Sequence, residues 1–277
     1  MAAIALALAA SVTWGSADFV GGLLSRRLAL ASVVAVSQAA GLAAVLAAAA
    51  VVGGVEPEAV GLGALAGLFG GVGVVCYYRA LAVGTMSIIA PLTACGALVP
   101  FTLALAGGER PSAGRLAGAL VALAGAILAS FHEHGRGGAS RDSVLLALVT
   151  ALMFGLLFYF LARASSAGGA LSALLGSRAG SFSLLALGSL ALRPAVTHPS
   201  APALAGTATA GVLAAAANGL FGLAAERGLL SIVSLLAALY PVTTVLLAQA
   251  VLGERFTLLP ALGVAVTLTG VAIVVSA

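Results

Sequence analysis

Long apolar runs, separated by short polar or turn-forming breaks, fill almost the whole chain. A helix needs about 20 mostly apolar residues to cross a bilayer, and the chain divides into ten runs of roughly that length. The predicted helices cover residues 2–24, 29–52, 60–82, 86–106, 112–131, 143–163, 169–192, 203–225, 230–251 and 257–276. The most polar break, residues 132–142, follows the fifth run and predicts a connecting loop. The pattern therefore predicts an all-α polytopic membrane protein with ten transmembrane helices.

The two halves of the chain repeat one another. Trp14-Gly15 and Phe154-Gly155 lie 140 residues apart, and the tripeptide Gly108-Glu109-Arg110 returns 145 residues later as Gly253-Glu254-Arg255. Each half, 1–131 and 143–277, holds an odd number of predicted helices, so the second half enters the membrane in the opposite orientation. Inverted repeats of this kind are typical of transporters that expose a central site to each side in turn.

Several motifs occur in a fixed order along the two halves. They are Trp14-Gly15-Ser16, Ala90-Pro91-Leu92, Gly108-Glu109-Arg110-Pro111-Ser112, Leu239-Tyr240-Pro241-Val242 and Gly253-Glu254-Arg255-Phe256-Thr257. With these motifs the sequence resembles the EamA-type permeases of the drug/metabolite transporter superfamily over essentially the whole chain. The resemblance implies two EamA-like five-helix repeats and secondary transport of a small metabolite, often outward. It also implies a multi-pass protein of the cell inner (plasma) membrane and leaves the substrate open.

Composition agrees with a lipid environment. Hydrophobic residues make up 62% of the chain and charged residues 7%, against roughly 45–50% and 25% in soluble domains. The formal charge is +4, but the arginines fall mostly between apolar runs, where they anchor loops, so we expect no nucleic-acid partner. The two cysteines, Cys76 and Cys95, lie inside apolar runs and predict small buried side chains rather than a disulfide.

No catalytic signature occurs in the sequence. Phosphate-binding loops, zinc-protease motifs and nucleophile elbows are all missing, so we expect no enzyme and no cofactor. His132-Glu133-His134 has no third ligand at metal-binding spacing, and we expect no metal. Transport would then be driven by a gradient or by exchange, with the lipid bilayer and a small-molecule substrate as partners, in a monomer or weak homodimer.

Asp18 is the sharpest candidate for chemistry. It follows Trp14 by four residues and so shares its helical face. A charged side chain within a membrane helix is costly, and such residues usually face a wet cavity or a partner. One interpretation is a proton or cation site on the transport pathway. The other is an anchor at the membrane interface, a turn or two from Arg26.

Polar and aromatic residues inside other runs complete the candidate site. Proline in a membrane helix frees a backbone carbonyl, and paired broken helices point to binding sites in transporters. The candidate substrate contacts are Trp14, Asp18, Gln38, Tyr77, Arg178, Asn218, Tyr240 and Thr244. Besides Asp18, three of them have an alternative: Tyr77 fits an interfacial aromatic belt, Arg178 could reach the nearer interface, and Asn218 could only join helices.

We therefore predict a secondary transporter of a small organic metabolite such as an amino acid, with Asp18 as the proton-coupling group. The alternatives are efflux of a lipophilic cation or drug, and a membrane channel or scaffold without transport. Two arguments on orientation disagree: the arginine distribution slightly favours both termini outside, whereas the resemblance implies cytoplasmic termini. We follow the resemblance.

Overall fold

The computed structural model describes residues 1–25, 28–83, 89, 92–129, 141–193, 195–196, 199–252 and 258–277. All regular secondary structure in these ranges is helical. The helices are α1 (Ala2–Ser25), α2 (Leu30–Val52), α3 (Pro57–Val83), the 3-10 turn η1 (Cys95–Ala97), α5 (Leu98–Ala106), α6 (Ala113–Ala129), α7 (Arg141–Gly168), α8 (Ala170–Leu192), α9 (Ala201–Ala225), α10 (Leu230–Ala237), α11 (Tyr240–Leu252) and α12 (Leu258–Ser276). The all-α prediction is confirmed.

The described helices are long and apolar enough for a membrane. Seven of them have the length and composition to cross a bilayer, among them Leu230–Val251, which contains α10 and α11. Three further apolar helices are shorter: Leu92–Ala106, Ala113–Ala129 and Ala261–Ser276. Large apolar side chains such as Leu187 and Leu190 are exposed on the outer surface, as expected where lipid replaces water. The described ranges thus contain all or part of each of the ten predicted crossings, although α7 extends beyond the predicted 143–163 at both ends.

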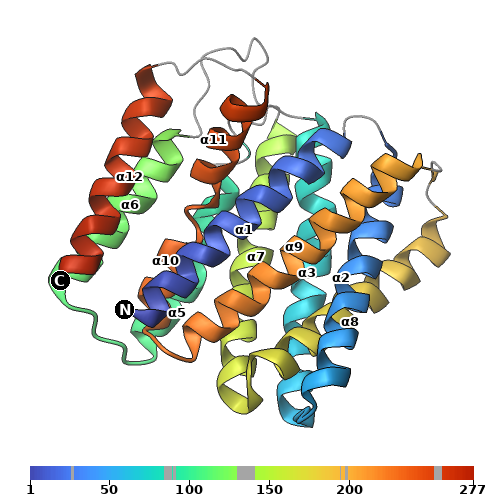
Figure 1. The fold of residues 1–277 in the computed structure, drawn as a ribbon, viewed down its shortest axis with the longest axis horizontal. Coiled ribbons are helices and arrows are strands. Elements are labelled where there is room, and N and C mark those ends of the chain that lie inside the picture. The colour runs from blue at the N-terminus through green and yellow to red at the C-terminus, as the bar shows by residue number, and fades with distance from the viewer. Residues whose placement is uncertain are drawn as a thin grey trace.

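The two halves have opposite orientations. In Figure 1, α1 rises from the N-terminus toward the top, whereas its counterpart α7 descends from the top. The pairs α2 with α8 and α3 with α9 are opposed in the same way. The termini lie at the same end of the bundle, together with the turn between α5 and α6 that carries Glu109. The inverted repeat is therefore confirmed; Glu254, predicted to lie opposite Glu109, is outside the described residues.

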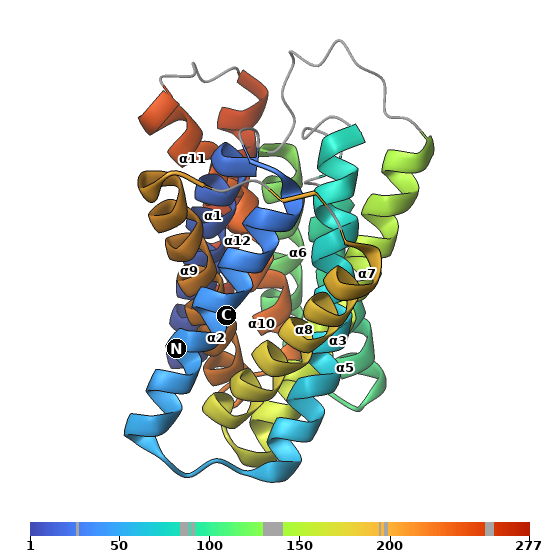
Figure 2. The same ribbon diagram turned by 90° about the vertical axis from the view of Figure 1, so that its right-hand side faces the viewer.

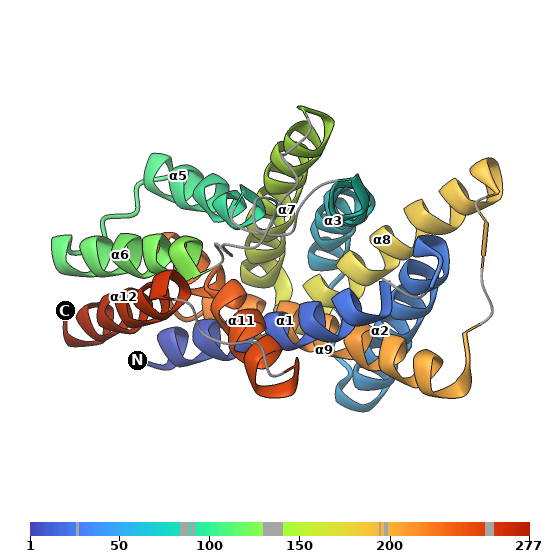
Figure 3. The same cartoon turned by 90° about the horizontal axis from the view of Figure 1, so that it is seen from above.

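Equivalent helices occupy equivalent places in the bundle. Seen from above, α6 and α12 pack together at one end, and α2 and α8 lie toward the other (Figure 3). Between them, α3 packs against both α7 and α8 (Figure 2), and its counterpart α9 packs against α1 and α2. The halves are thus interleaved, because α3 contacts two helices of the second repeat and α9 contacts two helices of the first.

Glycine permits the closest of these helix contacts. A Cβ atom on Gly67 of α3 would overlap the backbone oxygen of Ser177 in α8, and one on Gly211 of α9 would overlap that of Ser37 in α2. The two glycines are repeat equivalents, 144 residues apart, as are the two serines, 140 apart. Small residues let membrane helices approach until their backbones touch, so the same close contact is built twice.

The fourth and ninth crossings, described over Leu92–Ala106 and Leu230–Val251, both contain an interruption of the α-helix. Helix α10 ends at Ala237, and α11 begins at Tyr240 with Pro241 as its second residue. Proline has no backbone N–H and is compatible only with the first turn of a helix. In the fourth crossing, η1 precedes α5, and Pro100 lies in the first turn of α5. The sequence predicts broken helices at Pro91 and Pro100 and at Pro241; the interruptions ahead of Pro100 and Pro241 are confirmed, whereas Pro91 lies outside the described residues.

Glu109 caps the N-terminus of α10 from the other repeat. Its carboxylate accepts hydrogen bonds from the backbone N–H of Leu230 at 2.8 Å and of Ser231 at 2.9 Å, and from the Ser231 hydroxyl at 2.6 Å. A carboxylate suits this place because the first N–H groups of a helix lack partners and carry partial positive charge. The Gly-Glu-Arg turn therefore joins the two halves.

Candidate functional site

A cavity of about 150 Å³ lies at the centre of the bundle. A single buried water needs roughly 10–15 Å³ on this measure, so the space suits a small organic molecule. Its lining residues are Trp14, Ala17, Asp18, Ser37, Gln38, Gly67, Gly70, Val74, Tyr77, Thr93, Ala94, Ala97, Phe154, Leu157, Phe158, Ser177, Arg178, Ser181, Ala210, Gly211, Ala214, Asn218, Ala238 and Tyr240. The wall is formed by α1, α2, α3, α7, α8 and α9 and by the interruptions of the fourth and ninth crossings.

Most of the wall consists of equivalent positions from the two repeats. The pairs are 14 with 154, 17 with 157, 18 with 158, 37 with 177, 38 with 178, 67 with 211, 70 with 214, 74 with 218 and 94 with 238. The cavity therefore lies on the pseudo-two-fold axis that relates the halves. Its chemistry is not symmetric, because the repeat equivalent of Asp18 is the aromatic Phe158, that of Asn218 is Val74, and that of Arg178 is Gln38.

Trp14 and Asn218 are joined across the bundle. The indole N–H of Trp14 in α1 donates to Oδ1 of Asn218 in α9 at 3.0 Å. The Trp14 ring also packs against Phe158, with ring centroids 4.9 Å apart, and against Phe221 at 5.8 Å. Aromatic contacts and one internal hydrogen bond thus hold the Trp14 side chain rigidly on the cavity wall.

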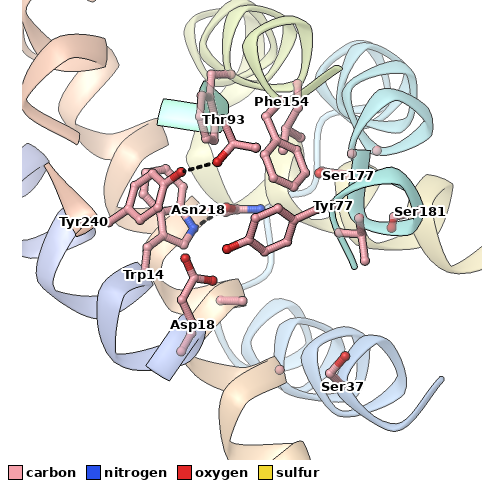
Figure 4. A pocket seen from close by; sticks show the side chains of 18 of the residues that line it. Trp14, Asp18, Ser37, Tyr77, Thr93, Phe154, Ser177, Ser181, Asn218 and Tyr240 are labelled. Atoms are coloured by element: carbon pink, nitrogen blue, oxygen red, sulfur yellow. Dashed lines mark hydrogen bonds between the residues drawn. The ribbon is translucent and has the colours of Figure 1, made fainter. Parts of the chain in front are cut away.

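Asp18 directs its carboxylate into the cavity, between Trp14 and Tyr77 (Figure 4). Tyr240 lies close enough to interact electrostatically with it, and the Tyr240 hydroxyl lies 3.5 Å from that of Thr93. Among the residues that the structure describes, none forms a hydrogen bond or ion pair with the Asp18 carboxylate. Because Asp18 lies on the cavity wall, the structure favours a site on the transport pathway over an anchor at the membrane interface.

Gln38 and Arg178, the equivalent residues of the second and seventh predicted helices, contact each other. The Arg178 guanidinium donates through Nη1 to Oε1 of Gln38 at 3.2 Å, and Nε2 of Gln38 donates to the Ser181 hydroxyl at 2.8 Å. Arg178 is only 7% exposed, so it does not reach an interface. Two repeat equivalents can touch only near the axis, so the Arg178 guanidinium lies near the centre of the molecule.

The structure also locates the two remaining candidates. Tyr77 is buried, lines the cavity and packs against Phe154 of α7. The belt interpretation of Tyr77 is therefore wrong. Thr244 does not reach the cavity: its hydroxyl donates to the carbonyl oxygens of Gly15 and Tyr240, each at 3.2 Å, and so joins α11 to α1.

Several wall residues were not predicted from the sequence. They include Thr93, Phe154, Phe158, Ser37, Ser177 and Ser181. Single serines and aromatic residues are common in membrane helices and carry little signal. The 140-residue offset that matches Trp14 with Phe154 also matches Ser37 with Ser177, and residues paired in this way near the broken helices are the signal that would have found them.

These features define a class: a polytopic membrane protein of two inverted repeats around a central cavity, as in transporters. The EamA-like transporter family matches residues 1–131 and 142–276. The chain therefore belongs to this family of membrane transporters. A solved crystal structure of a protein superposes with a TM-score of 0.82 at 19% identity, covering 98% of this chain and 95% of that one, which shows the shared fold. No curated protein matches the sequence.

Proposed function

We propose that the protein is a proton-coupled secondary transporter of a small organic metabolite such as an amino acid. The observation that carries this proposal is the Asp18 carboxylate, which faces a central cavity without a hydrogen-bonding partner among the described residues. Alternating access between the inverted repeats would move the substrate, in the outward direction and across the cell inner (plasma) membrane, as the family resemblance implies.

The proton would act by changing the cost of closing the cavity. A charged carboxylate is stable while the cavity is open to water, but it is costly once the helices close around it. A protonated Asp18 removes that cost. Proton binding therefore shifts the equilibrium toward closed states, and release on the other side reverses the shift. This links the direction of transport to a pH gradient.

The test is flux into proteoliposomes that contain the purified protein. Radiolabelled amino acids, offered one at a time, are the probes, and uptake is compared with and without an imposed pH gradient. We expect a gradient to accelerate uptake of at least one amino acid several-fold in the parent and to have no effect in Asp18→Asn, which keeps the shape and removes the charge.

Asp142→Asn is the matched control, because Asp142 is exposed in the first turn of α7. It should behave like the parent. Equal acceleration in Asp18→Asn and in the parent would refute proton coupling through Asp18. A parent protein without saturable flux would refute transport itself and leave the channel or scaffold alternative.

One observation favours lipophilic cations as a second substrate class. Trp14, Tyr77 and Tyr240 line the cavity beside Asp18, and aromatic faces attract cations. Tetraphenylphosphonium is the probe for this class. Its uptake, with no uptake of any amino acid, would replace the first proposal with the second.

A further inference from the structure

The Arg178 guanidinium is buried with fewer partners than its chemistry requires. A guanidinium has five N–H donors and no acceptor. The Nη1 atom of Arg178 donates to the neutral Gln38 side chain, while Nε is buried and has no hydrogen-bond partner in the described part of the protein. Burying a charge without pairing it is costly, so the protein has left this cation incompletely satisfied on the cavity wall.

The protein supplies no anion for Arg178 within the described residues. Asp18 lines the same cavity but lies on α1, near Tyr240, and forms no ion pair with Arg178. The other described acids lie at helix ends or in turns, where Glu109, for example, is committed to the N-terminus of α10. With no counter-charge from these residues, a molecule in the cavity is the candidate to supply one.

The neighbours of Arg178 hold it in place for such a molecule. Gln38 directs its oxygen toward Arg178 because its nitrogen donates to Ser181. Helix α2 also packs closely beside the guanidinium, because Gly41 has no side chain. A Cβ atom on Gly41 would lie 3.5 Å from Nη1 of Arg178 and 3.0 Å from the backbone oxygen of Gly211 in α9. The guanidinium is therefore fixed between α2, α8 and α9, and little rotamer freedom is lost when a ligand binds.

We propose that Arg178 and Gln38 form an anion subsite that binds a carboxylate of the transported molecule. This inference rests on the proposed function, namely that the cavity holds a transported substrate. A planar carboxylate matches the guanidinium geometry and gives strong charge-assisted hydrogen bonds. With Asp18 on a different wall, the described lining of the cavity then carries one charge of each sign and selects zwitterions, such as amino acids, over their amides and over simple cations.

The test compares acids with their amides on the purified full-length protein in nanodiscs. Ligand-induced thermal stabilisation is titrated with each of several amino acids and with the matching amino acid amide, such as L-leucine and L-leucinamide. We expect at least a tenfold preference for the acid in the parent. In Arg178→Gln the preference should fall below about twofold, because a neutral side chain cannot distinguish a carboxylate from an amide by charge.

Two further variants keep the test decisive. Arg163→Gln removes an exposed arginine of α7 and should leave the preference intact. The double variant Gln38→Arg with Arg178→Gln moves the guanidinium to its contacting repeat equivalent, and it should retain most of the preference even if Arg178→Gln alone does not fold.

The inference is overturned if the parent binds no amino acid better than its amide, or if folded Arg178→Gln keeps the preference. Loss of the preference in the folded double variant would also overturn the role of the Gln38–Arg178 pair. Proteoliposome flux separates this failure from that of the proposed function. Saturable uptake of amides or tetraphenylphosphonium that is independent of Arg178 leaves transport standing, whereas no flux of any probe refutes both.

Discussion

At the scale of single residues, polar groups inside apolar runs gave the best guide to the cavity. Of the predicted set, all but Thr244 line it. A polar side chain within a membrane helix is costly to expose to lipid, so it points inward, and the sequence reveals this. The sequence does not reveal which neighbouring helix covers a given face. It therefore could not show that Tyr240 lines the cavity while Thr244 contacts α1 instead.

The Trp14–Asn218 hydrogen bond should contribute a measurable coupling energy. Trp14→Phe removes the donor, and Asn218→Val reproduces the apolar residue found at the equivalent Val74. A double-mutant cycle removes the packing change that each single substitution also causes. We expect a coupling of about 0.6 kcal/mol, up to about 1.7 kcal/mol, as for other interhelical hydrogen bonds in membranes. The free energy of unfolding in mixed micelles measures it, and a coupling indistinguishable from zero would contradict the assigned bond.

At the scale of helices, apolar run length predicted which segments exist, and proline predicted where two of them break. The ends were less predictable. Helix α7 begins at Arg141 and continues to Gly168, beyond the apolar run, because tertiary contacts at a helix end stabilise turns that local composition does not favour. Composition near the end of α3 also fits an interfacial belt for Tyr77, and its packing against Phe154 of α7 is what shows that it lines the cavity.

The contact between α3 and α8 should depend on the absence of a side chain at Gly67. Gly67→Ala places a Cβ atom against the Ser177 backbone oxygen, and overpacking of this kind costs about 1–3 kcal/mol. Gly61 lies on the same helix with no atom near its missing Cβ, so Gly61→Ala should be neutral or slightly stabilising through helix propensity. Thermal unfolding of both variants side by side checks this. Equal midpoints would show that the two helices separate without cost.

At the scale of the whole molecule, the repeat in the sequence predicts the architecture. The unequal chemistry of the two repeats at the cavity wall is evident only in the structure. The alignment matched Gln38 with Arg178, but only the fold shows that these two residues touch. Contact between equivalent residues occurs only near the symmetry axis, and a sequence does not show which of its equivalent positions lie there. Asp18 and Phe158 are another matched pair that lies on the cavity wall and not on the outer surface, and the sequence alone does not show this.

The orientation of the whole molecule in its membrane is the last prediction. An even number of crossings places both termini on one side, as Figure 1 shows for the bundle ends. More of the arginines fall on the opposite side, which by the positive-inside rule would put the termini outside. Arg178 must be left out of that count, because it is buried at the axis. The remaining bias comes from few residues, so we follow the family resemblance and predict cytoplasmic termini.

A C-terminal fusion to a fluorescent protein that matures only in the cytoplasm should be bright, and a C-terminal fusion to a phosphatase that is active only outside should be inactive. A dark but fully expressed fluorescent fusion, together with an active phosphatase, would reverse the orientation and with it the direction in which a proton on Asp18 drives transport.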